Sequence, residues 1–418
     1  NGGSEWGTTA FPTPASSNND SSFAEARLEA PLVSPDPQLF EGTLSVQVDI
    51  PEGATLRYTT DGSTPTLENG QTSEDGRFEV STTSVFRFCL FKEGFLPSRV
   101  VSRSYILKDK DFNIPIISVC TKSANIWSTE YGIFAKGEHG RAGNGQSEKC
   151  NWNMEWERPV NMEYFNEDGE VLLNQEADFA ACGGWSRAYL PHSFELKANK
   201  LYELENRFEA PILPTKPYNK YRSVKFRNGG NDNVCRIKDP AIQEIIRTSG
   251  FYVDTQGYYP TCVYINGVFM GTLNLREPNN KDYGYSNYGY DTDWMDSFEI
   301  SPDSDYVQKK GTKEAFSKLV SLCQNSSIEA NYQKIQQLLD IDEYTNYMAA
   351  ELYLGATDWL SNNVKGFRSL DVQDDGRFHI VMFDTDSTLG TEDPFNRLQG
   401  FNNDFTKIFK GLLKNKTW

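Results

Sequence analysis

The sequence Asp358-Trp359-Leu360-Ser361-Asn362-Asn363 is followed, after a short segment, by Phe383-Asp384-Thr385-Asp386. Protein kinases transfer a phosphoryl group with an aspartate, an asparagine five positions later and a further aspartate after a downstream strand. In this interpretation Asp358 orients or deprotonates an acceptor hydroxyl. Asn363, together with Asp384 or Asp386, is the predicted ligand set for magnesium.

The segment between these two stretches is predicted to be a β-hairpin. Residues 366–372 and 377–383 are the expected strands, and Asp374-Asp375-Gly376 between them is a strong turn signal. Such a hairpin would bring Asp384 back beside the loop that begins at Asp358.

The ordered motifs resemble the CotH kinase family, which is named for a spore-coat protein and is spread among bacterial surface proteins. Four further segments resemble this family in the same order: a strand at 114–119, the glycine loop Gly183-Gly184-Trp185-Ser186-Arg187, a strand exit at 227–232, and hinge strands at 264–271 and 275–277. The resemblance covers roughly residues 110–400. It implies a kinase-like domain that uses ATP and Mg²⁺, with Mn²⁺ or Ca²⁺ as other candidate ions.

The order of predicted elements from residue 176 is that of a kinase N-lobe. A strand at 176–182, the glycine loop, strands at 192–197 and 221–227, and a helix with Asp239 as N-cap and Pro240 at its first position follow one another. We therefore expect an α+β, atypical protein-kinase-like, two-lobed domain over 109–418, with an N-lobe over about 109–278 and a C-lobe over about 279–418.

The resemblance also implies the residues that contact the nucleotide. The glycine loop would lie over the phosphates, and Glu277 would lie at the hinge or pair with an arginine to tie the lobes together. The family commonly has a lysine where this chain has His192, which is mostly neutral near pH 7 if unperturbed. The expected nucleotide contacts are Gly183, Gly184, Ser186, Arg187, His192, Lys197, Arg227 and Glu277, with Lys225 as another candidate cation.

Helical periodicity is clear in the predicted C-lobe. Apolar residues recur at helical spacing over 316–323 and 335–339, and Asp340-Ile341-Asp342-Glu343 resembles a capping box that opens the next helix. We expect the buried face of that helix to include Tyr344, Met348 and Leu352. The segment 283–290 is rich in Tyr, Gly and Asn, and we interpret it as an insertion or a substrate loop.

Residues 27–108 form a separate unit by pattern. Short alternating strands broken by Gly, Pro and Asp predict an all-β sandwich. The segment 58–66 resembles the chitobiase C-terminal-like sandwich, which implies a spacer or a module that contacts a surface glycan. Its Asp61-Gly62-Ser63 residues are turn formers and need no ligand to explain them.

Composition limits the partners. The chain has 418 residues and a net charge of −17, which argues against nucleic acid or an anionic membrane surface. Its seven cysteines form no Cys-x-x-Cys pair, so most are expected to be small buried hydrophobes. No apolar run is long enough to span a bilayer.

The first 26 residues are a polar Gly/Ser/Thr/Pro/Asn tract that cannot bury enough apolar area to order itself. We interpret residues 1–26 as the flexible tether of an exported protein. The predicted location is the cell surface or the periplasm, with a lipid anchor or in soluble, secreted form.

The leading hypothesis is an ATP-dependent protein kinase that phosphorylates Ser or Thr of a surface or secreted protein. The competing hypothesis, suggested by His192, is a catalytically inactive kinase-like adhesion or scaffold protein that binds a metal or a glycan. A hydrolase with Asp358 and Asp386 as paired carboxylates has less support, because no sugar cleft is marked around them.

Overall fold

The computed structural model describes residues 8–9, 24–143, 146–202, 206–232, 234–302, 304–390 and 393–418. Most of the tether predicted for 1–26 lies outside the described residues. The described residues fall into two compact units. The first lies within 8–181, 199–202 and 260–272, and the second within 182–198, 206–259 and 273–418.

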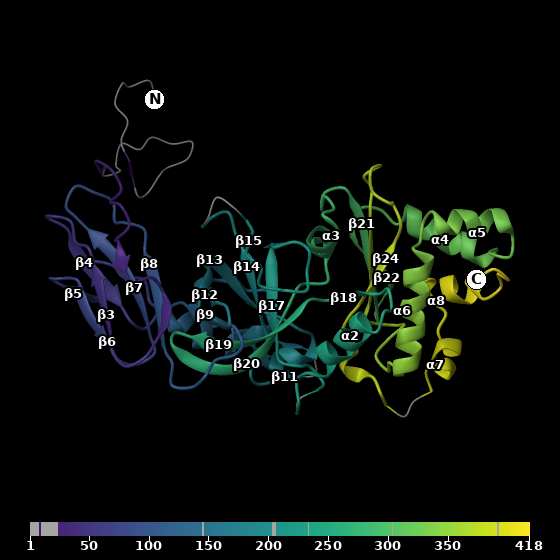
Figure 1. The fold of residues 1–418 in the computed structure, drawn as a ribbon, viewed down its shortest axis with the longest axis horizontal. Helices are drawn as coiled ribbons and strands as arrows, with labels where there is room; N and C mark the ends of the chain where they lie inside the picture. The colour runs from purple at the N-terminus through teal and green to yellow at the C-terminus, as the bar shows by residue number, and fades with distance from the viewer. Residues whose placement is uncertain are drawn as a thin grey trace, which may run out of the picture. The chain divides into compact units, whose positions relative to one another are not determined.

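The first unit begins with two packed β-sheets (Figure 1), which confirms the predicted all-β region. One sheet has the order β1 (Val33–Ser34), β3 (Leu44–Val48), β6 (Arg77–Val80); the other has the order β2 (Gln38–Phe40), β8 (Val101–Leu107), β7 (Ser84–Phe91), β4 (Thr55–Thr59), β5 (Gln71–Ser73). Their shared core includes Val46, Leu56 and Phe88, because alternating apolar residues of both sheets point inward.

The remainder of the first unit is also mostly strand. It contains β9 (Ile116–Cys120), α1 (Ser123–Trp127), β10 (Lys136–Gly143), β11 (Gln146–Cys150), the 3₁₀ turn η1 (Asn151–Asn153), β12 (Arg158–Phe165) and β13 (Val171–Ala181). Strand β12 pairs antiparallel with both β13 and β9. The predicted strand at 114–119 corresponds to β9.

The second unit begins with a short turn and five strands. These are η2 (Trp185–Ala188), β14 (Phe194–Ala198), β15 (Phe208–Glu209), β16 (Lys220–Tyr221), β17 (Ser223–Arg227) and the end of β20 (Val268–Arg276). Strand β19 (Tyr258–Ile265) begins in this unit and ends in the first. Strand β17 pairs antiparallel with β14 and β20. Phe194 and Phe226 stack on the apolar face with centroids 4.7 Å apart, so Arg227 and Arg276 project from the opposite, charged face.

Helix α2 (Lys238–Thr248) begins differently from the prediction. Asp239 is not the N-cap: it lies in the first turn, and the helix begins at Lys238. The Asp232 carboxylate instead accepts the backbone N–H groups of Ile237 and Lys238, each at 2.9 Å. This frees the Asp239 side chain for partners outside the helix.

The predicted loop at 283–290 is wrong, because α3 (Lys281–Tyr288) is a helix. The Asn280 side chain caps it by accepting from Asp282 N, and Gly289 ends it in the left-handed conformation. Tyr283 is buried against Phe367, so packing overrides the weak helix propensity of Tyr, Gly and Asn.

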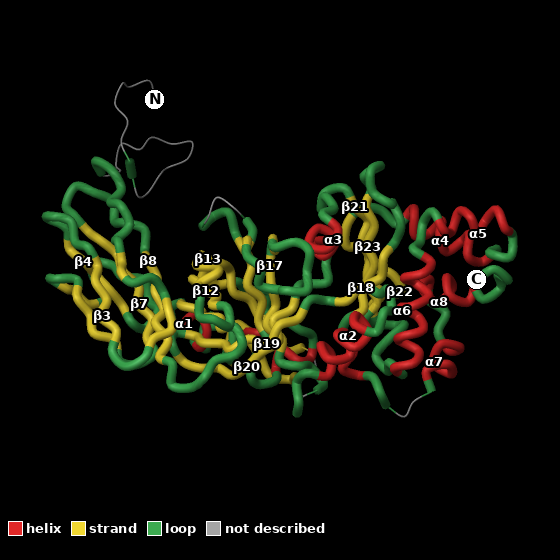
Figure 2. The backbone as a smooth tube through the Cα atoms, viewed as in Figure 1, coloured by secondary structure: helices red, strands yellow, loops and turns green. Residues whose placement is uncertain are grey.

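A five-stranded sheet with helices on both faces forms the C-terminal part (Figure 1). Its order is β18 (Asp254–Thr255), β24 (His379–Met382), β23 (Val364–Ser369), β21 (Met295–Ser301), β22 (Ser304–Lys310). Figure 2 shows how helices gather here: α4 (Glu314–Gln324), α5 (Glu329–Gln336), α6 (Ile341–Leu354), α7 (Pro394–Gly400) and α8 (Asp404–Leu412). Ile380 and Met382 face the core shared with these helices, whereas Val381 faces α3.

Several local predictions are confirmed. Strands β23 and β24 form the expected antiparallel hairpin, and Asp340 caps α6 by accepting from Glu343 N at 3.0 Å. All seven cysteines are free thiols, and all but Cys235 are buried. Among the described residues, none of the helices is both long and apolar enough to cross a membrane.

Candidate functional site

Two loops that carry the predicted catalytic groups are joined by hydrogen bonds. The first follows α6, which ends at Gly355 in the left-handed conformation. The second contains the 3₁₀ turn η3 (Thr385–Ser387). Both N and Oγ1 of Thr357 donate to Ser387 O at 2.9 Å. Asp358 and Asp386, each one residue from this contact, therefore lie on paired backbone segments.

Backbone strain is concentrated in the same two loops. Of the six described non-glycine residues with positive φ, four lie here: Leu360 (74°), Asn363 (54°), Asp384 (57°) and Leu389 (55°). This conformation is unfavourable for residues with a Cβ, and such residues cluster at functional sites. Packing holds the first loop in place: Trp359 is buried, and its Nε1 donates to Tyr347 Oη at 2.8 Å.

Asp358 and Asn363 contact each other. Asn363 Nδ2 donates to the Asp358 backbone oxygen at 3.0 Å and to its Oδ2 at 3.3 Å. Asp358 is exposed and therefore open to an acceptor. The amide oxygen of Asn363, the atom that a metal would need, has no hydrogen bond from any described residue.

Asp384 and Asp386 sit beside a cation and a tight turn. Arg227 NH2 lies 3.2 Å from Asp384 Oδ1. Asp386 is buried, and its two oxygens accept from Asn231 N at 2.8 Å and Asn231 Nδ2 at 3.2 Å. Burial, and secondarily the charge of Asp384, raise the pKa of Asp386 to about 6.

Asp239 links this cluster to β20. Its carboxylate accepts Thr385 N at 2.9 Å and lies 2.9 Å from Arg276 NH1. Burial alone would raise the pKa of Asp239, but Arg276 and these hydrogen bonds lower it. Burial would likewise lower the pKa of Arg227, but Asp384 raises it. Each of the carboxylates Asp384 and Asp239 thus lies beside an arginine, Arg227 and Arg276 respectively.

The donor set fits a hard divalent cation. Carboxylate and amide oxygens are the ligands that Mg²⁺ prefers. Each hydrogen-bonded carboxylate oxygen keeps a second lone pair for a metal. Asp384, Asp386 and Asn363 carry such oxygens on the two loops and stay the predicted Mg²⁺ ligands.

The glycine loop is organised by one asparagine from the end of β17. Asn228 Nδ2 donates to the carbonyls of Ser186 at 3.0 Å, Tyr189 at 3.2 Å and Pro191 at 2.9 Å. Arg187 Nε folds back onto Gly183 O at 2.5 Å. A Cβ added at Gly184 would meet no atom within 4 Å, so this backbone is open to an approaching group.

His192 has a structural position in this loop. Its Nδ1 lies 2.8 Å from Arg187 O, and burial lowers its pKa below 6.5. It is therefore neutral at pH 7 and supplies no charge where the family commonly has lysine. Arg227, on the charged face of β17, is the predicted cation that meets the carboxylates.

The other two predicted contacts lie elsewhere. Lys197 is half-buried on β14, opposite Ser223. Glu277 is fully buried, and Lys216 Nζ lies 2.6 Å from its Oε1. Gly257 N and Asn287 Nδ2 complete its hydrogen bonds. The predicted pair of Glu277 with an arginine that ties the lobes together is therefore wrong, because its cation is Lys216 of the same unit and the same predicted lobe.

Lys365 was missed by sequence reasoning. It follows Asn363 by two positions, and its Nζ lies 5.2 Å from the Phe383 ring centre. Burial lowers the pKa of Lys365 to about 8. It lines a cavity of about 270 Å³ together with Asn279, just beyond the predicted hinge. The signal was a lone lysine among apolar residues in β23. The sequence patterns predict Asp239 only as a helix cap and Asn231 only as part of a strand exit.

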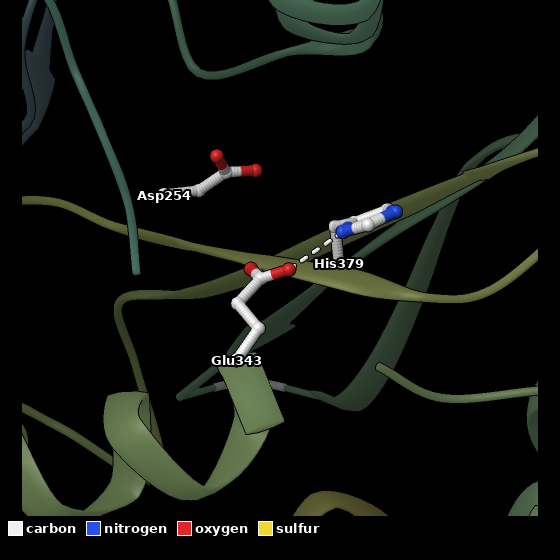
Figure 3. A group of neighbouring side chains, drawn as sticks. All are labelled: Asp254, Glu343 and His379. Carbon is white, nitrogen blue, oxygen red and sulfur yellow. Dashed lines mark hydrogen bonds and ion pairs between the residues drawn. The ribbon is translucent and has the colours of Figure 1, made fainter. Parts of the chain in front are cut away.

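A second group of ionisable side chains lies where the C-terminal sheet meets α6, with Asp254 on β18, His379 on β24 and Glu343 in the first turn of α6 (Figure 3). Asp254, Glu343 and His379 offer ligand atoms within 4.8 Å of one another. His379 Nδ1 lies 2.6 Å from Glu343 Oε2, its Nε2 lies 3.1 Å from Asp375, and Asp254 accepts from Tyr288 at 2.9 Å. Since both ring nitrogens already have carboxylate partners, this group is a buried ion cluster rather than an open metal site.

Comparison with known proteins gives two family matches. The family described as CotH kinase protein matches residues 180–417, more than half of the chain, and the chitobiase/beta-hexosaminidase C-terminal domain matches residues 35–102. A search of the curated proteins found no match. Among solved structures, Drosophila OTK extracellular domains 3-5 are similar over 60% of this chain and 88% of that chain, at 10% identity and a TM-score of 0.15, which is too low to inform the fold.

Proposed function

Since the chain belongs to the CotH kinase protein family, we propose that it is an atypical ATP-dependent protein kinase. It also carries a chitobiase C-terminal-like module. Both resemblances seen in the sequence are thus confirmed. The proposed acceptor is a Ser or Thr hydroxyl of a secreted or surface protein. In this proposal the matched region forms a two-lobed, kinase-like domain. The observation that carries it is the pairing of the Asp358 loop with the Asp384–Asp386 loop through Thr357 and Ser387.

The proposed roles follow from the position of each group. Asp358, exposed in the loop between α6 and β23, accepts the proton of the acceptor hydroxyl. The hydroxyl oxygen meanwhile bonds to the γ-phosphorus of ATP, and the bond from that phosphorus to the ADP oxygen breaks. Asp384, Asp386 and Asn363 would hold Mg²⁺, which would neutralise charge on the phosphate oxygens. Arg227 holds Asp384 in place. The open backbone at Gly184 gives the phosphates close access to N–H groups.

The test measures phosphate transfer from labelled ATP with Mg²⁺ to casein as a generic Ser/Thr acceptor. We expect Asp358→Asn and Asp384→Asn each to lower the rate by roughly 10²–10⁴-fold, the usual effect of losing a positioned general base or charge. Asp371→Asn, a carboxylate in the hairpin connection, is the matched control and should retain full rate. An unchanged rate of phosphate transfer in Asp384→Asn would contradict the proposal.

One observation favours the competing scaffold. His192 is neutral and bonded to its own loop, so the position where the family commonly has lysine supplies no cation for the phosphates. Titration calorimetry with Mg-ATP separates the two functions. Saturable binding supports the kinase, whereas a chain that binds no Mg-ATP but binds Ca²⁺ or a glycan is the scaffold.

A further inference from the structure

The first unit contains a polar cavity that the proposed kinase chemistry does not use. Its volume is about 600 Å³, and it lies where strands β7 and β8 of the sandwich meet β12 and β13. The side chains that matter here are Arg87, Arg99, Arg103, Asn161, Asn174 and Glu176. All of them belong to the same compact unit, so the cavity is a feature of that unit alone.

The cavity is cationic in an acidic chain. Arg27, Arg87, Arg99 and Arg103 line it, and Glu176 is the one carboxylate among its described lining residues. Oε1 of Glu176 lies 3.8 Å from Arg87 NH2, and the Glu176 side chain is half-exposed. Arg27 and Arg99 form no ion pair with any described residue. Arg103 NH2 lies 3.5 Å from Oδ1 of the exposed Asp36, outside the lining. Four guanidinium groups against one carboxylate in the lining, in a chain of net charge −17, indicate a site for an anion.

Two buried polar groups of the lining are only partly paired. Arg87 is 9% exposed: its NH1 donates to Gly62 O at 3.2 Å, but within the described chain its Nε has no partner. Asn161 is 7% exposed: its Nδ2 donates to Asn174 at 3.2 Å, but its Oδ1 also has no described partner. Buried polar atoms are normally paired, so this wall of the cavity has hydrogen-bonding capacity left over.

The lining also selects the kind of anion. Guanidinium groups bind a carboxylate through two parallel hydrogen bonds. The amides of Asn161 and Asn174 and the hydroxyls of Thr64 and Ser102 both donate and accept, as sugar hydroxyls do. The volume is that of a site for an organic molecule rather than for one inorganic ion. We infer that this cavity binds an acidic saccharide, with the carboxylate of a uronic acid on the arginines and its hydroxyls on the amides.

The experiment uses calorimetry on the full chain with trigalacturonate, a neutral maltotriose and sodium sulfate at one fixed ionic strength. We expect saturable binding of trigalacturonate that weakens as salt is raised. Arg99→Ala and Arg87→Gln should each reduce the affinity at least tenfold. Arg77→Ala removes an exposed arginine of the same sandwich outside the cavity and should bind as the wild type does.

Arg99 is exposed, so its alanine variant keeps the test valid if Arg87→Gln fails to fold. Absence of trigalacturonate binding, equal binding of maltotriose, or unchanged affinity in Arg99→Ala overturns the inference. Sulfate bound as tightly as trigalacturonate overturns the saccharide assignment. Phosphate transfer should be unchanged in Arg99→Ala, so this result is independent of the kinase proposal.

Discussion

Gly230 is a single position on which the geometry of the carboxylates depends. It adopts φ of 61°, and a Cβ there would lie 2.3 Å from Asp386 Oδ2. We expect Gly230→Ala to displace Asp386, to lower phosphate transfer at least tenfold and to destabilise the fold by more than the roughly 1–2 kcal/mol of left-handed strain alone. Activity and urea unfolding are the two measurements.

Gly376→Ala is the matched control for this prediction. Its φ of 64° imposes the same backbone strain, but an added Cβ meets no atom within 4 Å. It should therefore lose about 1 kcal/mol of stability and no activity. Equal losses of activity in both variants would show that strain, not the position of Asp386, causes the effect.

His379 should make stability depend on pH in the alkaline range. Burial would lower its pKa, but hydrogen bonds with Asp375 and Glu343 raise it to about 10; Asp254 and Tyr288 face it from β18 and α3. A folded-state pKa above the unfolded value of about 6.5 stabilises the fold fully below pH 6.5, and this contribution is lost as pH rises toward 10.

Between pH 6.5 and pH 10, the free energy of unfolding should fall by up to about 1.4 kcal/mol per pH unit. Urea unfolding of the wild type at pH 6 and pH 9 measures it. His379→Gln, which cannot be protonated, should be less stable at pH 6 and should show a flatter dependence. A variant with the same slope as the wild type would contradict this role of His379.

Helix α6 depends on its first turn. Asp340 accepts from Glu343 N, and its other oxygen lies 3.3 Å from Arg377. We expect Asp340→Ala to cost about 1 kcal/mol of unfolding free energy, the usual effect of losing an N-cap. Asp342→Ala removes an exposed acid from the same turn without removing the cap, and it should cost less than half as much. The denaturation midpoint of each variant is the measurement.

Elements with strong local signals could be predicted from sequence. The hairpin of β23 and β24 has a turn of Asp and Gly, and α6 has a capping residue and an apolar stripe. The Glu343 side chain, however, does not complete the capping box: it accepts from Ile380 N and meets His379. A local motif predicted the helix start but not the tertiary partner of its third residue.

The rest could not be predicted because it depends on contacts between distant residues. Helix α3 is built from poor helix formers and is held by the packing of Tyr283. Asp239 matched a cap pattern, yet its partners are Arg276 and Thr385. The cation opposite Asp384 was among several candidates, and only the strand pairing of β17 placed Arg227 there.

At the scale of the whole molecule, the cysteines offer a simple test of packing. All seven cysteines are reduced, and Cys235 is the exposed one. We expect a thiol reagent to label one cysteine rapidly in the native protein and seven after denaturation, and Cys235→Ser should abolish the fast phase. Rapid native labelling of two or more thiols would show that the buried positions are accessible. Reducing agents should leave the thermal midpoint unchanged.

Asn228 is a site at which the chain can be damaged chemically, by deamidation. It is followed by Gly229, the neighbour that most readily lets a backbone nitrogen attack the side-chain amide and release ammonia. The product is a cyclic imide, which water opens to a carboxylate, and this carboxylate would repel the three carbonyls that the amide now holds. Burial protects Asn228 while the fold is intact, so each transient opening of this region is an opportunity for irreversible ageing of the glycine loop.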